Sequence, residues 1–353
     1  MTTTRLVIGC MSGTSMDGID AALLRVKGTG LAMQCEFVEG TSTPLPHAET
    51  LRAFSNGASL SARTLASIAR DVGDMHKDLI TGLVRHSTPD LIVMHGQTVL
   101  HSPPLSWQLV DPWPVASAFD CRVVTDLRSR SLASGGQGAP LTPLADWILF
   151  RNRSDSRCIA NLGGFVNLTM LPAQPEVTTI LPETVRGEDV CPCNLILDRL
   201  ARELLDTPYD DEGQTGLGGS VHPAVAGKVA VRFVNTGSRS LGTGDEAMFV
   251  DDAVRHLSAG DALATVCDAI ARPIASKAAG STLVLAGGGV QNAALMRSLE
   301  RHHRGRMHVV DELGIPARFR EAVAFGVLGA LAEDGVPVSL PQITGATTTG
   351  RDG

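Results

Sequence analysis

Apolar and polar positions divide the chain into short strand-like runs and longer helical ones. Apolar runs at 5–8 and 21–26 flank a turn rich in Gly, Ser and Thr, which predicts two neighbouring strands joined as in a hairpin. The same pattern of strand, glycine turn and strand recurs at 157–171. The recurrence predicts two structurally related halves.

Between and after these hairpins, apolar residues recur at helical spacing or form short continuous runs. The expected helices are 60–84, 194–205, 262–277, 292–302 and 317–333, and the expected buried strands are 91–94, 123–125 and 283–286. Alternating strands and helices favour an α/β protein. The small residues of 317–333 suit packing in a homodimer and packing in a core equally well.

Composition narrows the class of protein. The 353 residues are 43% apolar and 19% charged, which suits a folded chain of two domains. The net charge of −7, without any basic block, argues against a nucleic-acid partner. Aromatic residues make up only 4%, which argues against stacking platforms, so any sugar site must rely on polar contacts.

Other features concern the compartment. No apolar run approaches the roughly 18 residues of a membrane span, and the apolar stretch from Leu6 to Met11 is too short for a signal-peptide core. The seven cysteines are an odd number, scattered through the chain, which favours reduced thiols over a disulfide framework. We therefore expect a cytoplasmic protein without a membrane partner.

Two glycine turns are candidate phosphate sites. The turn after the first strand offers three hydroxyls and several backbone amides, which suit phosphate oxygens, and Asp17 and Asp20 are candidate Mg²⁺ ligands. An ordinary hairpin turn is the alternative. Gly163 and Gly164, with Asn167, form a second candidate clamp. The predicted phosphate contacts of the first turn are Ser12, Gly13, Thr14, Ser15, Met16, Asp17, Gly18, Ile19 and Asp20.

A third glycine turn, Gly287, Gly288 and Gly289, precedes a helix that begins near Asn292. Glycines there allow close approach of a nucleotide, and a helix N-terminus favours anions. A dinucleotide site is the alternative, since Asp311 follows Gly289 by 22 residues. It fits poorly, because that motif is expected in the first strand–helix unit.

Several charged residues are candidates for chemistry, each with a plainer alternative. Asp126, Arg128 and Arg130 follow a strand, where an arginine suits a substrate carboxylate, or where a surface ion pair forms. Asp189 lies just before a predicted helix, as a general base or as a simple N-terminal charge. His95 ends a buried strand, as a ligand or as a core histidine.

Three further groups receive no role. His302 and His303 are expected at a solvated helix end. Cys191 and Cys193 form a weak metal signal without a second pair nearby, and the acidic segment 206–213 lacks the spacing of a calcium loop.

Taken together, these segments resemble the anhydro-N-acetylmuramic acid kinases of the sugar kinase, Hsp70 and actin superfamily, over nearly the whole chain. The stretches that carry the resemblance are IGCMSGTSMDGID (8–20), HGQTVLHSP (95–103), GGQGAPLTPLAD (135–146), NLGGFVNLT (161–169), TPYDDEG (207–213), AGGGVQN (286–292), EAVAFGVL (321–328) and LPQITGA (340–346).

The resemblance implies two actin-like, ribonuclease H-like domains around a central nucleotide and sugar cleft. The domains expected from it are 1–128, with the tail 335–353 packing back on it, and 129–334. It implies that Mg-ATP is held by the glycine turns. It also implies a double reaction in cell-wall recycling, in which water opens the 1,6-anhydro bond of an amino sugar and the released O6 takes the γ-phosphoryl group.

Motif matching assigns further roles. The family motif D-T-G-P-G-N aligns with residues 189–194, which makes Asp189 the base. By the same matching Glu321 and Arg128 are sugar contacts, with His95 and Gln97 at the wall of the site. Asp126 and Arg130 complete the expected sugar-binding set.

The sequence differs from the family pattern at three places. Both glycines of D-T-G-P-G-N are cysteines, Cys191 and Cys193, which are expected to narrow the approach of the backbone to a ligand. The family's D-x-R-R-R-D ends here in Ser131, and S-T-G-R-E is matched by 242–246, where Asp245 replaces an arginine. These differences leave a second hypothesis open, a relative that binds sugar or nucleotide but catalyses weakly.

Overall fold

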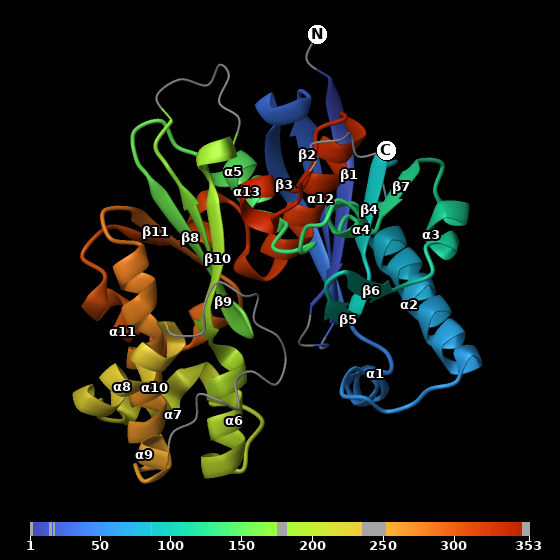
Figure 1. Ribbon diagram of the computed structural model, residues 1–353. Coiled ribbons are helices and arrows are strands. Elements are labelled where there is room, and N and C mark those ends of the chain that lie inside the picture. Colours follow the sequence, from blue (N-terminus) through green and yellow to red (C-terminus); the bar gives the residue numbers. More distant parts are fainter. Residues whose placement is uncertain are drawn as a thin grey trace. The chain divides into compact units, whose positions relative to one another are not determined.

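A computed structural model of the chain describes residues 3–13, 16, 18–85, 87–174, 182–234 and 252–347. The chain forms two compact units (Figure 1). Unit 1 comprises 1–150, 177–183 and 314–353, and unit 2 comprises 151–176 and 184–313. These bounds differ from the predicted domains: unit 1 continues past residue 128 to Phe150 and takes up the chain again at Gly314. No helix in the described residues is long and apolar enough to cross a membrane.

Each unit is built on a five-stranded mixed sheet. In unit 1 the strand order is β3 (Gln34–Pro44), β2 (Gly18–Lys27), β1 (Thr4–Ser12), β4 (Leu91–His95) and β7 (Arg122–Thr125). In unit 2 it is β10 (Arg186–Pro192), β9 (Phe165–Leu171), β8 (Arg157–Leu162), β11 (Thr282–Ala286) and β12 (Met307–Val309).

The two sheets share their strand order and their strand directions. In both, the first three strands form an antiparallel meander, and the last two run parallel to the strand that opens the unit's sheet. Both meanders contain the glycine hairpin that the sequence predicts. The expectation of an α/β protein with two related halves is therefore confirmed.

Helix α12 (Arg320–Glu333) forms the core of unit 1 because its small residues allow close contact with β1 (Figure 1). A Cβ atom on Gly9 would lie only 2.0 Å from the carbonyl oxygen of Ala322. Gly326 and Gly329 make similarly close contacts with β1, β2 and β4 residues. Of the two alternatives for this segment, packing in the core is the one observed.

The other elements of unit 1 surround this sheet. They include a two-stranded hairpin that lies outside the main sheet. They are α1 (Ala48–Ser55), α2 (Ala62–Leu83), β5 (Gln97–Ser102), β6 (Leu105–Leu109), α3 (Trp113–Ala118), α4 (Ser129–Ala133), α5 (Thr142–Phe150) and α13 (Pro341–Thr344).

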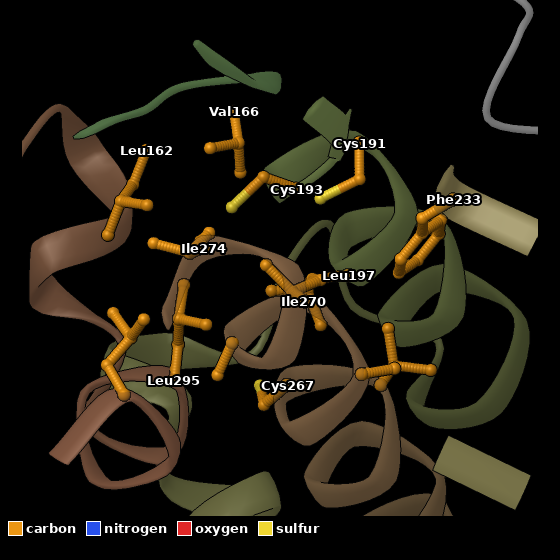
Figure 2. Packing of buried hydrophobic residues seen from close by; sticks show 14 of the residues in the cluster. Leu162, Val166, Cys191, Cys193, Leu197, Phe233, Cys267, Ile270, Ile274 and Leu295 are labelled. Carbon is orange, nitrogen blue, oxygen red and sulfur yellow. The ribbon is translucent and has the colours of Figure 1, made fainter. Parts of the chain in front are cut away.

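Unit 2 packs its helices around α10 (Ala259–Lys277), which is buried along most of its length. Its core is drawn in Figure 2, where apolar side chains of α10 face the sheet and α6. The other helices are α6 (Asn194–Leu205), α7 (Gln214–Gly218), α8 (Pro223–Val234), α9 (Asp252–Arg255) and α11 (Ala293–His302).

Residues 186–192 form the edge strand β10, which the sequence pattern did not predict, and Asp189 lies on it, five residues before α6. One expectation about local structure is wrong. The end of α11 is not solvated: His303 is 5% exposed, and His302 Nε2 lies 2.8 Å from the buried Asp268 carboxylate. Arg272 donates to the same carboxylate at 2.7 Å, so His302 links α11 to Asp268 and Arg272 of α10, while His303 is the buried C-cap of α11.

Candidate functional site

In unit 2, three backbone segments meet at the carboxyl ends of the parallel strands. They are the β8–β9 turn, the start of α6, and the turn after β11. The amide of Asn194 donates to the carbonyl of Gly163 at 3.1 Å, and the Asn194 side chain donates to the carbonyl of Leu162 at 3.2 Å. The carboxyl ends of strands are where α/β sheets bind ligands. The glycine hairpin and the helix N-terminus are thereby fixed together.

Gly287 requires its lack of a side chain. Its φ is +84°, and a Cβ atom there would lie 2.8 Å from the carbonyl oxygen of Leu162. Gly288 and Gly289 follow in the short 3-10 turn η5 (Gly288–Gln291), in which the amide of Val290 donates to the carbonyl of Gly287. This backbone cradle suits a phosphate or a nucleotide, as predicted from the sequence.

Asn292 has a structural task in the cradle. It is the N-cap of α11, and its side-chain oxygen accepts from the amide of Leu295 at 3.0 Å. Gly213, from the acidic segment, approaches this side chain so closely that a Cβ atom would lie 2.2 Å from Oδ1. The side chain of Asn292 therefore holds the cradle, and a ligand contact from this residue remains a prediction.

Asp189 lies half-buried on β10 at a β-bulge, where the register with β9 shifts between Asp189 and Cys191. Bulges are frequent next to active sites, because they re-aim a side chain. Asn167 lies directly opposite on β9, and its amide nitrogen donates to Asp189 Oδ1. Two residues predicted for separate tasks, base and phosphate contact, are thus brought together on one sheet face.

In unit 1 the predicted residues are joined by side-chain hydrogen bonds, whereas backbone contacts join the turns of unit 2. Ser12 is buried at the end of β1, and its hydroxyl lies 2.7 Å from Gln97 Oε1 and 3.1 Å from the carbonyl of Gly18. Ile19 and Met16 point into the core, so any ligand contact from them uses their backbone. Thr14, Ser15 and Asp17 lie outside the described residues, as does 242–246.

Asp20, one of the two predicted magnesium ligands, has partners within the chain. Its carboxylate accepts from the Ser42 hydroxyl and lies 3.5 Å from Arg318 Nε. Within the described part of the chain, no three acidic, histidine or cysteine side chains gather around one point. A magnesium ion that enters with ATP needs only one or two carboxylates, so the role of Asp20 stays a prediction.

The buried His95 lies beside Arg128, which is half-buried. His95 is 1% exposed and stacks on Phe325, with ring centroids 4.1 Å apart. Arg128 Nη2 lies 3.4 Å from His95 Nε2, and Nη1 donates to the carbonyl of Gly138 at 2.9 Å. Burial holds the pKa of His95 well below its ordinary value, with smaller contributions from Arg128 and His101. The imidazole is neutral at pH 7, as in a core histidine.

Arg128 keeps its charge in spite of its position. Burial lowers its pKa to about 10, against the opposing effects of the Glu321 and Asp126 carboxylates. Its Nε atom is buried without a hydrogen-bond partner among the described residues. Glu321, Asp126 and Arg128 therefore lie near one another, as the prediction of a shared site requires. Arg130 is half-buried on α4.

A cavity of about 250 Å³ opens in unit 1 where β4 and β7 end. Its walls include Asp126, which was predicted from the sequence, and Trp107, which was not. The low aromatic content argued against stacking, and Trp107 lies in β6, a five-residue strand that was not among the expected elements. The available signal was the alternation of apolar and polar residues in LSWQL, soon after the HGQTVLHSP stretch.

Comparison with known proteins decides the family. The family model described as anhydro-N-acetylmuramic acid kinase matches residues 5–352. This chain belongs to that family. The anhydro-N-acetylmuramic acid kinase of Salinibacter ruber is 32% identical over 377 residues, which cover 97% of this chain and 94% of the relative. That of Bordetella parapertussis is 33% identical over 371 residues, covering 97% and 93%.

Solved structures give more distant likenesses. An activator of 2-hydroxyisocaproyl-CoA dehydratase from Clostridium difficile covers 93% of this chain and 95% of its own, at 13% identity and a TM-score of 0.46. A ROK family glucokinase from Streptomyces griseus covers 92% and 98%, at 14% identity and a TM-score of 0.39. The assignment of two actin-like domains rests on the repeated topology and on membership of the anhydro-N-acetylmuramic acid kinase family. Because this is a kinase family, ATP and not NAD is the nucleotide expected at the Gly287 turn.

Two of the three departures from the anhydro-N-acetylmuramic acid kinase motifs lie in the described residues. Cys191 and Cys193 are fully buried, and both thiols face the apolar core (Figure 2). Cys193 has φ −128°, and Cys191 is not among the described residues with positive φ, so neither position demands glycine. Burial raises the pKa of the Cys193 thiol to about 12. Ser131 is also buried, and its hydroxyl accepts from the amide of Gly138 at 3.1 Å.

Proposed function

We propose that this protein is an ATP-dependent kinase that hydrolytically opens 1,6-anhydro-N-acetylmuramic acid and phosphorylates its O6. The products are N-acetylmuramic acid 6-phosphate and ADP, and the reaction serves peptidoglycan recycling in the cytoplasm. The observation that carries the proposal is the position of Asp189 at a β-bulge, held by Asn167, in a chain that matches this kinase family from residue 5 to 352.

In the proposed reaction Asp189 is the general base. Its carboxylate takes a proton from water while the water oxygen forms a bond to the anomeric carbon. The bond from that carbon to O6 breaks, and O6 forms a new bond to the γ-phosphorus as the bond to ADP breaks. The Asn167 amide donates to Oδ1 of Asp189 and so fixes the orientation of the carboxylate. Because the carboxylate is already oriented, no entropy is lost in orienting it when the transition state forms.

Backbone groups of unit 2 are proposed to bind the ATP phosphates. The Gly163–Gly164 turn, the N-terminus of α6 and the Gly287 turn meet at one edge of the sheet, and only glycine fits at Gly287. Backbone amides at such a turn favour phosphate oxygens. A magnesium ion that enters with ATP neutralises charge on the phosphates. Asp20, and Asp17 outside the described residues, are the carboxylates that would hold it.

In unit 1 we propose that Arg128, with Glu321 and Asp126 nearby, belongs to the sugar site. The buried Nε–H group of Arg128 has no acceptor among the described residues, so it can donate a hydrogen bond to a ligand. The positive charge of the guanidinium suits the lactyl carboxylate of the substrate. The Ser12 hydroxyl donates to Gln97 Oε1, and this hydrogen bond joins the proposed sugar site to the glycine hairpin of unit 1.

The test is release of ADP from Mg-ATP by the purified protein, with and without 1,6-anhydro-N-acetylmuramic acid. Mass spectrometry of the product checks for addition of both water and a phosphoryl group. We expect ADP and the 6-phosphate in equal amounts, and only with the sugar present. Binding of the sugar without ADP release would support the non-catalytic relative instead, and absence of both would overturn the assignment.

A further inference from the structure

The cavity at the ends of β4 and β7 is walled on one side by apolar groups. Trp107 forms this wall with Met94, Val110 and Pro112. The indole is 42% exposed, which is unusual for so large a side chain with an apolar setting. Phe54 packs against it edge to face, with centroids 6.4 Å apart, and so fixes the plane of the ring. The wall is a preformed flat apolar surface.

Two polar residues that line the same cavity, Thr125 and Asp126, offer one donor and one acceptor. Within the described residues, the Thr125 hydroxyl makes no hydrogen bond with another side chain or with the backbone. The Ser129 hydroxyl donates to Asp126 Oδ2, and Asp126 Oδ1 accepts from none of the described groups. Thr125 and Asp126 both line the cavity. A planar ligand with a carbonyl and an N–H on its edges would satisfy them together.

We infer that this cavity binds the acetamido group of the sugar, with Trp107 packed on its flat face and methyl group. The inference rests on the proposed function and names the part of the substrate that unit 1 selects. The acetamido carbonyl accepts from the Thr125 hydroxyl, and its N–H donates to Asp126 Oδ1. The lactyl carboxylate is disfavoured here, because Asp126 carries the same charge.

The size and place of the cavity agree with this occupant. Ligands bind at the carboxyl ends of parallel strands, and both Met94 and Thr125 lie there. The volume of about 250 Å³ lies below the usual range for a whole small molecule, about 300 to 1,000 Å³. The cavity therefore suits one substituent of the sugar and not a disaccharide.

The test is a set of kinetic constants for Trp107→Ala, Trp107→Phe and the control Trp113→Ala. Trp113 is 70% exposed and does not line the cavity, so its removal controls for loss of a surface tryptophan. We expect Trp107→Ala to raise KM for the sugar about tenfold, as for a lost aromatic contact. KM for ATP should stay unchanged, Trp107→Phe should retain most of the affinity, and Trp113→Ala should behave as wild type.

The desacetylated sugar, 1,6-anhydromuramic acid, identifies the group that is bound. With it, wild type and Trp107→Ala should have equal KM values. An equal loss with both sugars would overturn the assignment of the acetamido group, and an unchanged KM in Trp107→Ala would overturn the role of Trp107.

Tryptophan fluorescence separates this inference from the proposed function. In a Trp113→Phe background, the acetylated sugar should change the emission of Trp107, and the change should vanish in Trp107→Phe. If no ADP forms but this response is seen with the acetylated sugar alone, the proposed kinase fails and the cavity assignment stands. If ADP forms without the response, the kinase stands and the cavity assignment fails.

Discussion

The two units share one sheet topology, yet the chain leaves the equivalent fourth strand of the sheet in different ways. After β11 in unit 2 it enters the Gly287 turn, which presents backbone and excludes side chains. After β4 in unit 1 it enters the β5–β6 hairpin, which brings Gln97 and Trp107 to the edge of the sheet. The carboxyl ends of the strands are thus lined by backbone groups in unit 2 and by side chains in unit 1.

The difference matches what each unit is proposed to bind. A phosphate presents similar oxygens on every side, so backbone amides and a helix N-terminus suffice for it. A sugar is recognised through donors, acceptors and apolar faces in a particular arrangement, which requires specific side chains. One fold therefore serves both tasks through the short segments that follow its strands.

The largest expected effect concerns the response of the units to acid. His76 in α2 of unit 1 is fully buried, and burial lowers its pKa to about 4 from 6.5. The unfolded chain binds this proton first, so stability is complete above pH 6.5 and falls as the pH drops towards 4. The loss reaches about 3 kcal/mol in the free energy of unfolding.

The measurement is urea unfolding at pH 7 and pH 5 for wild type, His76→Gln and the control His222→Gln. His222 is exposed in unit 2. We expect the difference between the two pH values to shrink only in His76→Gln. An equal pH response in all three proteins would show that His76 does not cause acid sensitivity.

Unit 2 should resist acid to a lower pH. Burial opposes ionisation of Asp268, yet hydrogen bonds from His302 and Arg272 lower its pKa overall from 3.8. Its contribution is present above that value and is lost only as the pH falls below it. Hydrogen exchange at pH 5 should therefore rise in α2 and not in α10. Faster exchange in α10 than in α2 would contradict the contrast.

The second effect concerns the backbone cradle. Gly287→Ala places a Cβ atom against the Leu162 carbonyl and strains a positive φ, at a cost of about 1–3 kcal/mol. We expect KM for ATP to rise about tenfold or more while KM for the sugar stays the same. Gly280→Ala is the matched control, because φ there is +80° and no atom lies within 4 Å. Equal effects of the two substitutions on KM for ATP would contradict the proposal that the Gly287 turn binds ATP.

The smallest effect concerns the cysteines beside the cradle. Cys193→Gly removes a buried thiol and loosens the backbone before α6, which should lower the free energy of unfolding by about 1–2 kcal/mol. Because the thiol faces the core, kcat should not increase. Thermal unfolding and steady-state kinetics check both statements, and an increase in kcat would show that the cysteine restricts the site.

The sequence predicted the elements whose patterns are strongest. Helices α2 and α6 and strands β4 and β11 were expected within a few residues of their observed ends. The strand β10 was missed because Glu188, Asp189 and Pro192 are uncommon in strands, and an edge strand tolerates them.

The chemistry was only partly predictable. Glycine turns indicate that the backbone closely approaches another group, so the turn at Gly287 could be found from the sequence. The contact of Asn167 with Asp189 depends on the register of two strands, and the cavity at Trp107 depends on a hairpin outside the main sheet. Neither follows from local spacing.

The most direct test of the account is kcat for Asp189→Asn beside Glu188→Gln. Glu188 is the preceding residue on β10, its side chain points to the other face of the strand, and Lys277 donates to it at 2.7 Å. Loss of a general base lowers rates by about 10²–10⁴, so we predict that fall in kcat for Asp189→Asn, with little change in either KM. Glu188→Gln should keep the kcat of wild type. An Asp189→Asn enzyme with a kcat near that of wild type would contradict the account.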